Sequence, residues 1–177
     1  HRGDALARWS LSWPRAFPAE IEAAAAEQKI PAALLMGLAR EESTFMADVI
    51  DAAGAVGLCQ LMPATAKDEA QALKLPAPTT ATLLDPATNA RLGAAHLARR
   101  LRGMSHPLLA IGAYNAGPGA VAKWLPPKGQ TMPLDLFVEE IPVDETRNYI
   151  KKVTGSWKTY AVLDGDGVVS FATKVKG

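Results

Sequence analysis

The segment PAALLMGLAREES, residues 31–43, decides the fold class and carries the first candidate site residue. It opens with Pro31, which suits the first position of a helix because the amide hydrogen that proline lacks has no partner there. Leu35, Leu38 and Glu42 follow at i, i+3 and i+7, so they share one face of the predicted helix. Glu42 therefore extends an apolar stripe, and a carboxyl group placed there loses hydration.

Prolines, glycines and capping residues mark further helices on both sides of this segment. Pro18 to Gln28 predicts a helix rich in Ala and Glu, and Pro63 predicts the start of another. Asp85 and Pro86 suit an N-cap and a first helical residue, in a helix that ends near Gly103. Further helices are expected from Pro107 through Tyr114, around Val121 and Trp124, and from an Asp144 cap through the mostly core aromatics Tyr149, Trp157 and Tyr160.

The segments between these helices predict loops and turns. Small residues from Asp51 to Gly57 favour an irregular loop or a short hairpin, and Pro76 to Thr80 reads as a proline-rich linker. In the tail from Tyr160 to Phe171, two short apolar runs flank the sequence DGDG, residues 164–167. This pattern favours a hairpin turn over a calcium site, because an EF-hand loop needs further oxygen ligands.

Length and composition predict one compact, mainly helical domain, all-α or α+β with at most a small β-hairpin. The 177 residues suit a single core, and abundant alanine favours helix over sheet. A net charge of +1, with scattered basic residues, argues against nucleic acid as a partner. No segment reaches the roughly 20 apolar residues of a membrane span.

The sequence predicts neither a metal nor a cofactor. His1, His96 and His106 lack the spacing of a ligand set. Cys59 is the only cysteine, so an internal disulfide is impossible, and we expect it to be a small core residue.

Four motifs follow one another along the chain: REES at 40–43, GAVGLCQLMP at 54–63, AYNAGPG at 113–119 and IPVDETRNY at 141–149. A weaker fifth, LDPATN at 84–89, is followed by Gly93. In this order and spacing, from about Trp13 to Tyr160, the chain resembles the catalytic domain of the soluble lytic transglycosylases, lysozyme-like enzymes that cut bacterial cell-wall glycan. The resemblance implies a single lysozyme-like domain over residues 1–177, with a groove for alternating N-acetylglucosamine and N-acetylmuramic acid.

The resemblance also implies the chemistry. In that family the glutamate immediately before the serine is the sole catalytic acid, and Glu42 holds this position; its neighbour Glu41, the nearest rival, lies about 100° around the helix. Glu42 would protonate the oxygen between the two sugars while the substrate's N-acetyl group stabilises the anomeric carbon. The Glu42 carboxylate would then accept the proton of the attacking muramoyl C6 hydroxyl, giving a 1,6-anhydro sugar without water.

Groove-lining residues follow from the other motifs of the family. Gln60 and Tyr114 hold such positions, with Met62 beside them, and Glu139 and Tyr149 stand where the family has a groove-side Glu and Tyr. The residues alone leave other interpretations open: a turn cap for Gln60, core packing for the two tyrosines and a solvated acid for Glu139.

Other motif residues are expected to serve the structure. Asn115 and Gly117 suit a turn, because both tolerate left-handed backbone conformations. Glu145 and Arg147 are expected to stabilise the last helix.

Two departures from the family concern Asp51, where the family often has Ser, and Cys59, where it often has Met. Asp51 could orient the N-acetyl group, hold a water for ordinary hydrolysis, or simply cap its loop. A lysozyme-type hydrolase that uses Asp51 is therefore one alternative, and a non-catalytic glycan-binding scaffold is another.

The resemblance places the protein in the bacterial periplasm or cell envelope, with peptidoglycan glycan strands as its partner. We expect a monomer. The interpretation also allows for a longer protein, because in the family a long helical domain often precedes such a catalytic end.

Overall fold

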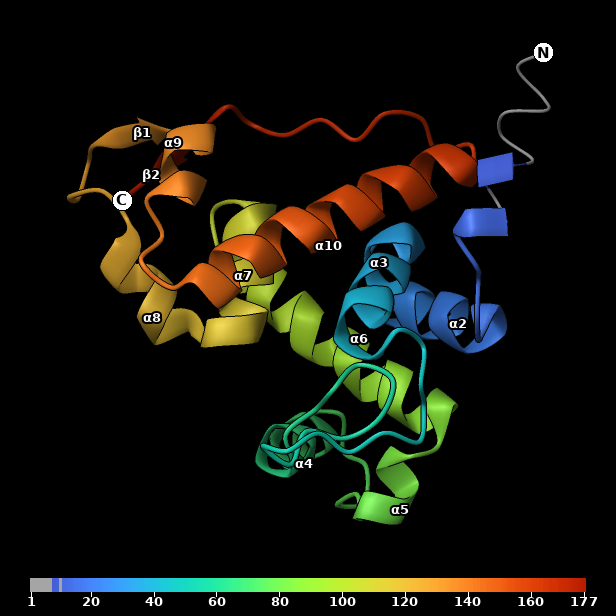
Figure 1. Cartoon of the computed structure of the whole chain (residues 1–177). Helices are drawn as coiled ribbons and strands as arrows, with labels where there is room; N and C mark the ends of the chain where they lie inside the picture. The colour runs from blue at the N-terminus through green and yellow to red at the C-terminus, as the bar shows by residue number, and fades with distance from the viewer. Residues whose placement is uncertain (1–7, 10) are drawn as a thin grey trace.

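The computed structural model describes residues 8, 9 and 11–177. It is mostly helical with one small antiparallel sheet, which confirms the expected fold class (Figure 1). None of the described helices has the length and hydropathy needed to cross a membrane. In chain order the labelled elements are α2 (Pro18–Gln28), α3 (Ala32–Ser43), α4 (Pro63–Ala72), α5 (Thr80–Leu83), α6 (Pro86–Gly103), α7 (Pro107–Ala116), α8 (Pro118–Trp124), β1 (Thr131–Pro133), α9 (Leu134–Glu139), α10 (Asp144–Leu163) and β2 (Lys174–Lys176).

The core forms around α3, whose residues from Ala33 to Ala39 are all buried. Figure 1 shows the long helix α10 running above α3 and α7, and α10 packs against both. The approach of α3 to α10 is close at Gly37, where an added Cβ would lie 2.8 Å from the backbone nitrogen of Trp157. The missing side chain of Gly37 therefore lets these two helices meet.

Helix α6 joins the rest of the molecule, because α2, α4, α5 and α7 all pack against it. The predicted cap is confirmed: Asp85 Oδ2 accepts hydrogen bonds from the backbone nitrogen of Thr88 at 2.8 Å and from its hydroxyl at 2.7 Å. The buried side chains of α6 include the polar residues Asn89 and His96. Both take part in the contacts described below.

Two predicted helix starts are displaced by one residue. Pro31 is the N-cap of α3 rather than its first residue, with ψ at 127°, and its carbonyl accepts the first helical hydrogen bonds. Asp144 does not cap α10; Val143 holds the N-cap position, and Asp144 instead pairs with Arg147 one turn later. In both cases the extended backbone needed at an N-cap falls one residue from the expected place.

Helices α5 and α9 were not predicted. Helix α5 follows the proline-rich segment because Thr79 and Thr82 form a reciprocal capping box. Between α3 and α4, the loop predicted around Asp51 to Gly57 is irregular, with isolated bridges from Val56 to Ile50 and to Leu61.

The hairpin predicted around residues 164–167 is wrong. Helix α10 continues to Leu163, and the amide hydrogens of Asp164 and Asp166 bond back to its last turn, so this segment ends a helix. The chain then returns along α10 to β2, which pairs with β1 more than forty residues earlier (Figure 1). The small sheet thus joins distant segments, which a local sequence pattern does not predict.

Candidate active site

Glu42 lies in the last turn of α3, at the end of the apolar stripe predicted for it. The hydroxyl of Tyr149, on α10, donates a short hydrogen bond to Glu42 Oε1. Leu38 and Leu35, one and two turns before Glu42, are fully buried. The packing of α10 on α3 therefore places a phenol hydrogen on a carboxyl group at the edge of the core.

The environment of Glu42 favours its protonated form. Burial raises the pKa of the Glu42 carboxyl from its ordinary 4.5 to about 7, against the hydrogen bond from Tyr149, which lowers it. The negative charges of Asp51 and Glu145 raise the pKa further. This confirms the expectation of a desolvated acid, and a carboxyl with such a pKa can donate a proton near neutral pH.

Glu41, the nearest rival, has a different setting. Its Oε1 accepts a hydrogen bond from Ser156 Oγ at 2.5 Å and lies 3.8 Å from Arg40 Nε. Glu41 is therefore held by a hydroxyl of α10 and lies beside a neighbouring cation. Of the two adjacent acids, Glu42 has the environment of a proton donor.

An open cleft lies beside these two acids. It is bounded by the C-terminal turn of α3, the end of α7 and one face of α10, and its lining consists of Glu41, Glu42, Asn115, Glu145, Asn148, Tyr149 and Lys152. Most of this lining is polar, so the cleft offers hydrogen-bond donors and acceptors next to the raised-pKa acid.

The loop after α3 is tied to the helices by buried polar groups. Ser43 Oγ donates to the carbonyl of Leu58 at 2.8 Å, directly after Glu42 in the chain. The fully buried amide of Asn89 donates to the carbonyls of Val56 and Leu83 and accepts from the nitrogen of Cys59, each at 2.8 Å. These bonds hold the second motif against α6.

Gln60 lies on this loop, and Tyr114 of α7 lies over it. Gln60 has a left-handed backbone, with φ at 45°, and its Nε2 donates to the carbonyl of Gly57 at 2.7 Å. The Tyr114 hydroxyl donates to the carbonyl of Cys59 at 2.9 Å. Gln60 thus closes a turn, and Tyr114 supports that turn from α7. Met62, two residues after Gln60, is exposed at the N-cap of α4.

Asp51 is exposed, and its Oδ1 accepts a hydrogen bond from the backbone nitrogen of Ala55 at 2.8 Å. This is the geometry of the loop-capping alternative. Its charge still raises the pKa of Glu42.

Glu139 lies elsewhere. It pairs with Lys151 at 2.7 Å in a separate depression formed with Leu134, Thr154 and Lys158. Positions 149 and 151 point in different directions on α10, so the structure brings Tyr149 to Glu42 but not Glu139.

Sequence reasoning missed several cleft residues. Glu145 and Lys152 lie four residues before and three residues after Tyr149, so helical phase could have identified them once Tyr149 was placed in the groove, whereas Asn148 directly precedes Tyr149. Asn115 was expected to serve a turn, but its Oδ1 accepts from Thr146 Oγ1 at 2.6 Å and joins α7 to α10. Arg147 does stabilise the helix start, since it donates to the carbonyl of Ile141 at 2.8 Å.

The described residues contain no group of His, Cys, Asp and Glu that could hold a metal ion. Cys59 is fully buried, and burial raises its pKa, so it stays a thiol. A Cβ added to Gly93 would lie 2.7 Å from its sulfur, so Cys59 fills a core space that Gly93 leaves.

Comparison with known proteins gives a consistent result. A family model described as "Transglycosylase SLT domain" matches residues 19–133. The chain is 37% identical over 156 residues to the putative soluble lytic murein transglycosylase of Haemophilus influenzae, covering 87% of this chain and 26% of that protein. It is 36% identical over 141 residues to the soluble lytic murein transglycosylase of Escherichia coli K12, covering 78% of this chain and 22% of that one.

Among solved structures, an inactive mutant of the lytic transglycosylase Slt from Pseudomonas aeruginosa superimposes with a TM-score of 0.82 at 34% identity, over 88% of this chain and 25% of the other. The chain thus spans about a quarter of the length of the relatives it matches.

Proposed function

The chain belongs to the transglycosylase SLT domain family, and from this membership we propose that it is a peptidoglycan lytic transglycosylase with Glu42 as its catalytic acid and base. The observation that carries the proposal is the Glu42 carboxyl, whose pKa is raised to about 7 while Tyr149 holds one of its oxygens. The proposed substrate is the glycan strand of peptidoglycan, cut between N-acetylmuramic acid and N-acetylglucosamine.

The proposed reaction uses the Glu42 carboxyl group twice, first as an acid and then as a base. Glu42 gives its proton to the glycosidic oxygen, the bond from that oxygen to the muramoyl anomeric carbon breaks, and the substrate's N-acetyl carbonyl stabilises the carbon. The muramoyl C6 hydroxyl then bonds to the anomeric carbon and returns its proton to the Glu42 carboxylate. The 1,6-anhydro ring closes without water, so the cleft must mainly orient the sugar.

The raised pKa suits both steps. A carboxyl with a pKa near 7 is substantially protonated at neutral pH and, once ionised, is a stronger base than an ordinary glutamate. The Tyr149 hydroxyl fixes one carboxyl oxygen, which leaves the other to face the substrate. A pure binding scaffold has no need for such an acid.

Four expected site residues keep a proposed rather than an observed role. Gln60, Met62 and Tyr114 are proposed to face the glycan from the loop side of the groove, and Glu139 to contact a more distant part of the strand. The hydrolase alternative would require Asp51 to activate a water, but one of its oxygens is engaged by Ala55 in capping the loop.

We further propose that the chain acts as one monomeric lysozyme-like catalytic domain in the bacterial cell envelope, the compartment that holds murein. Sedimentation of the purified chain tests the monomer.

The deciding experiment is mass spectrometry of purified peptidoglycan digested by the chain. Wild type is expected to release fragments with 1,6-anhydro-muramic ends, and Glu42→Gln to release on the order of a thousandfold less. Glu41→Gln is the matched comparison, because it changes the adjacent acid in the same way, and it is expected to retain the anhydro product. Reducing muramic ends from the wild type would overturn the transglycosylase assignment and favour the hydrolase.

A further inference from the structure

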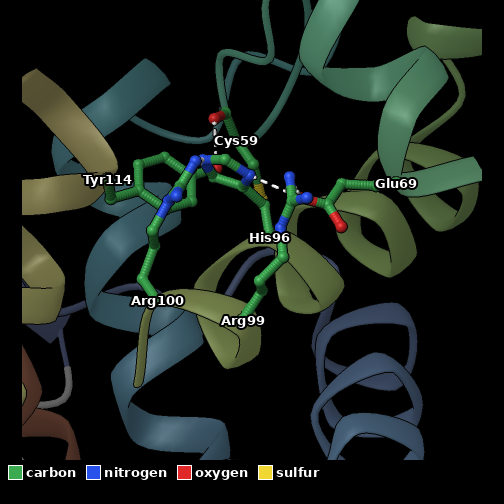
Figure 2. A network of polar contacts seen from close by, with 6 residues as sticks. All are labelled: Cys59, Glu69, His96, Arg99, Arg100 and Tyr114. Carbon is green, nitrogen blue, oxygen red and sulfur yellow. Dashed lines mark hydrogen bonds and ion pairs between the residues drawn. The ribbon is translucent and has the colours of Figure 1, made fainter. Parts of the chain in front are cut away.

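A second buried polar cluster lies where α4, α6 and α7 meet the loop after α3 (Figure 2). It contains Glu69 from α4, His96 from α6 and Tyr114 from α7, with Arg99 and Arg100 beside them. Glu69 is 2% exposed and His96 5%. Burial of a carboxyl and an imidazole disfavours folding unless both groups have hydrogen-bond partners. The partners of Glu69 and His96 therefore show what holds this cluster together.

The hydrogen bonds of His96 orient its ring. Nδ1 lies 2.6 Å from Glu69 Oε1, and Arg99 pairs with the same carboxyl. Nε2 lies 3.4 Å from Arg100 Nε. A guanidinium can only donate, so Nε2 accepts, and the ring proton is on Nδ1 and is donated to Glu69. The His96 ring is thus held in one orientation by contacts at both of its nitrogens.

The oriented ring meets Tyr114. The two ring centroids are 4.9 Å apart with an interplanar angle of 73°, an edge-on contact. Figure 2 shows His96 between Glu69 and Tyr114, with the Tyr114 hydroxyl directed at the Cys59 carbonyl. Cys59 directly precedes Gln60. Burial raises the pKa of Tyr114, and the charge of Glu42 raises it further. The contacts therefore lead from a buried carboxylate to the loop beside the catalytic cleft.

We infer that Glu69 and His96 are positioning residues: Glu69 orients the His96 ring, the ring holds Tyr114, and Tyr114 holds the turn from Gly57 to Gln60. This inference rests on the proposed function, since it assigns the pair a part in turnover. Neither residue touches the substrate. A small displacement of a substrate-orienting group can slow an enzyme strongly, so a loosened Tyr114 is expected to reduce the rate.

Two substitutions at position 96 separate the ring from its hydrogen bonds. His96→Leu removes both the aromatic ring and its hydrogen bonds. His96→Phe removes the hydrogen bonds but keeps an aromatic edge against Tyr114. In both variants Arg99 still pairs with Glu69. We expect His96→Leu to lower the rate of anhydro-product release about tenfold. In His96→Phe the rate of anhydro-product release is expected to stay within about threefold of that of wild type.

His106 offers a matched control. It is 3% exposed, its Nδ1 accepts from the nitrogen of Leu108 at 3.1 Å and its Nε2 donates to the carbonyl of Ala172 at 3.0 Å, but its ring contacts Phe171 instead of Tyr114. His106→Leu therefore removes an equally buried, doubly bonded imidazole. It is expected to lower the melting temperature but to leave the rate at a temperature well below melting unchanged.

A spectroscopic measurement tests the positioning without any activity. Tyrosine labelled with carbon-13 at Cζ gives three signals, one for each tyrosine of the chain, and substitution of each by Phe assigns them. The Tyr114 signal reports its hydroxyl bond to Cys59. It is expected to shift in His96→Leu and, by less, in Glu69→Gln, and to stay in place in His106→Leu.

An unmoved Tyr114 signal in both Glu69→Gln and His96→Leu would overturn the inference, as would equal rates for His96→Leu and His106→Leu. If His96→Leu does not fold, Glu69→Gln alone decides by the same signal, because it preserves the side-chain shape. Absence of anhydro product from the wild type would instead refute the proposed function and leave the Tyr114 result to be judged by itself.

Discussion

The Tyr149 hydroxyl donates its hydrogen to Glu42 Oε1 across 107 positions of sequence. The bond joins the last turn of α3 to the first turns of α10, and those two helices pack closely because Gly37 has no side chain. The acid and the phenol are thus held on separate, rigid elements. This favours a fixed carboxyl orientation over a mobile one.

Tyr149→Phe is expected to raise the pKa of Glu42. The Tyr149 bond lowers that pKa, so its loss allows burial to act with less opposition. The protonated acid then persists to higher pH, and the alkaline limb of the pH–rate profile moves upward. The maximal rate is expected to fall about tenfold because the carboxyl loses its anchor.

Anhydro-product release measured from pH 5 to 9 checks this. Tyr160→Phe is the matched control, since Tyr160 lies about three turns further along α10 and its hydroxyl donates to the carbonyl of Pro14 instead of to Glu42. An equal shift of the alkaline limb of the pH–rate profile in both variants would contradict the role given to Tyr149.

Glu145→Gln is expected to shift the same limb in the opposite direction. The charge of Glu145 raises the pKa of Glu42, so its removal lets Glu42 ionise at lower pH. Glu139→Gln is the comparison, because Glu139 pairs with Lys151 in a separate depression. We expect the limb to stay in place in Glu139→Gln, and a shift there would show that general surface charge is responsible.

Glu42→Gln is expected to stabilise the protein above neutral pH. The Glu42 pKa is about 7 in the folded state against 4.5 ordinarily, so between these values the folded state binds a proton that the unfolded state lacks. Wild-type stability therefore falls as pH rises from 4.5 to 7, by on the order of 2–3 kcal/mol. The neutral amide avoids this loss.

Thermal unfolding at pH 4 and pH 8 measures the effect. Glu42→Gln is expected to melt several degrees above wild type at pH 8, and near it at pH 4 where both side chains are uncharged. Equal differences at the two pH values would show that Glu42 is not desolvated.

Gly37→Ala is expected to destabilise the protein by about 2 kcal/mol or more, because its Cβ would overlap the backbone of α10. Gly155→Ala is the matched control in α10, where an added Cβ meets nothing within 4 Å. Alanine favours a helix over glycine by about 1 kcal/mol, so the control is expected to gain stability. Urea unfolding at constant pH compares them, and losses of equal size would rule out the close helix approach as the cause.

Local sequence signals correctly predicted those helices whose ends are set by prolines or capping residues in the same turn. Pro18, Pro63 and Asp85 mark α2, α4 and α6 because a missing amide hydrogen or a capping carboxylate acts within one turn. The tail was predicted wrongly, because Asp164 to Gly167 has the composition of either a hairpin turn or a helix end. Only the distant strand β1 decides where the last residues pair.

The features of the site also divide into those that the sequence indicated and those that only the tertiary structure decided. Helical phase and motif position indicated Glu42 without any partner in view, since burial of one helix face follows from the spacing of its apolar residues. Tertiary structure alone decided that Tyr149 bonds to Glu42, that Ser156 bonds to Glu41 and that Glu139 lies elsewhere. A pKa depends on the groups that folding brings within a few ångströms, so the sequence determined which acid is desolvated, and the packing of α10 on α3 decided how it titrates.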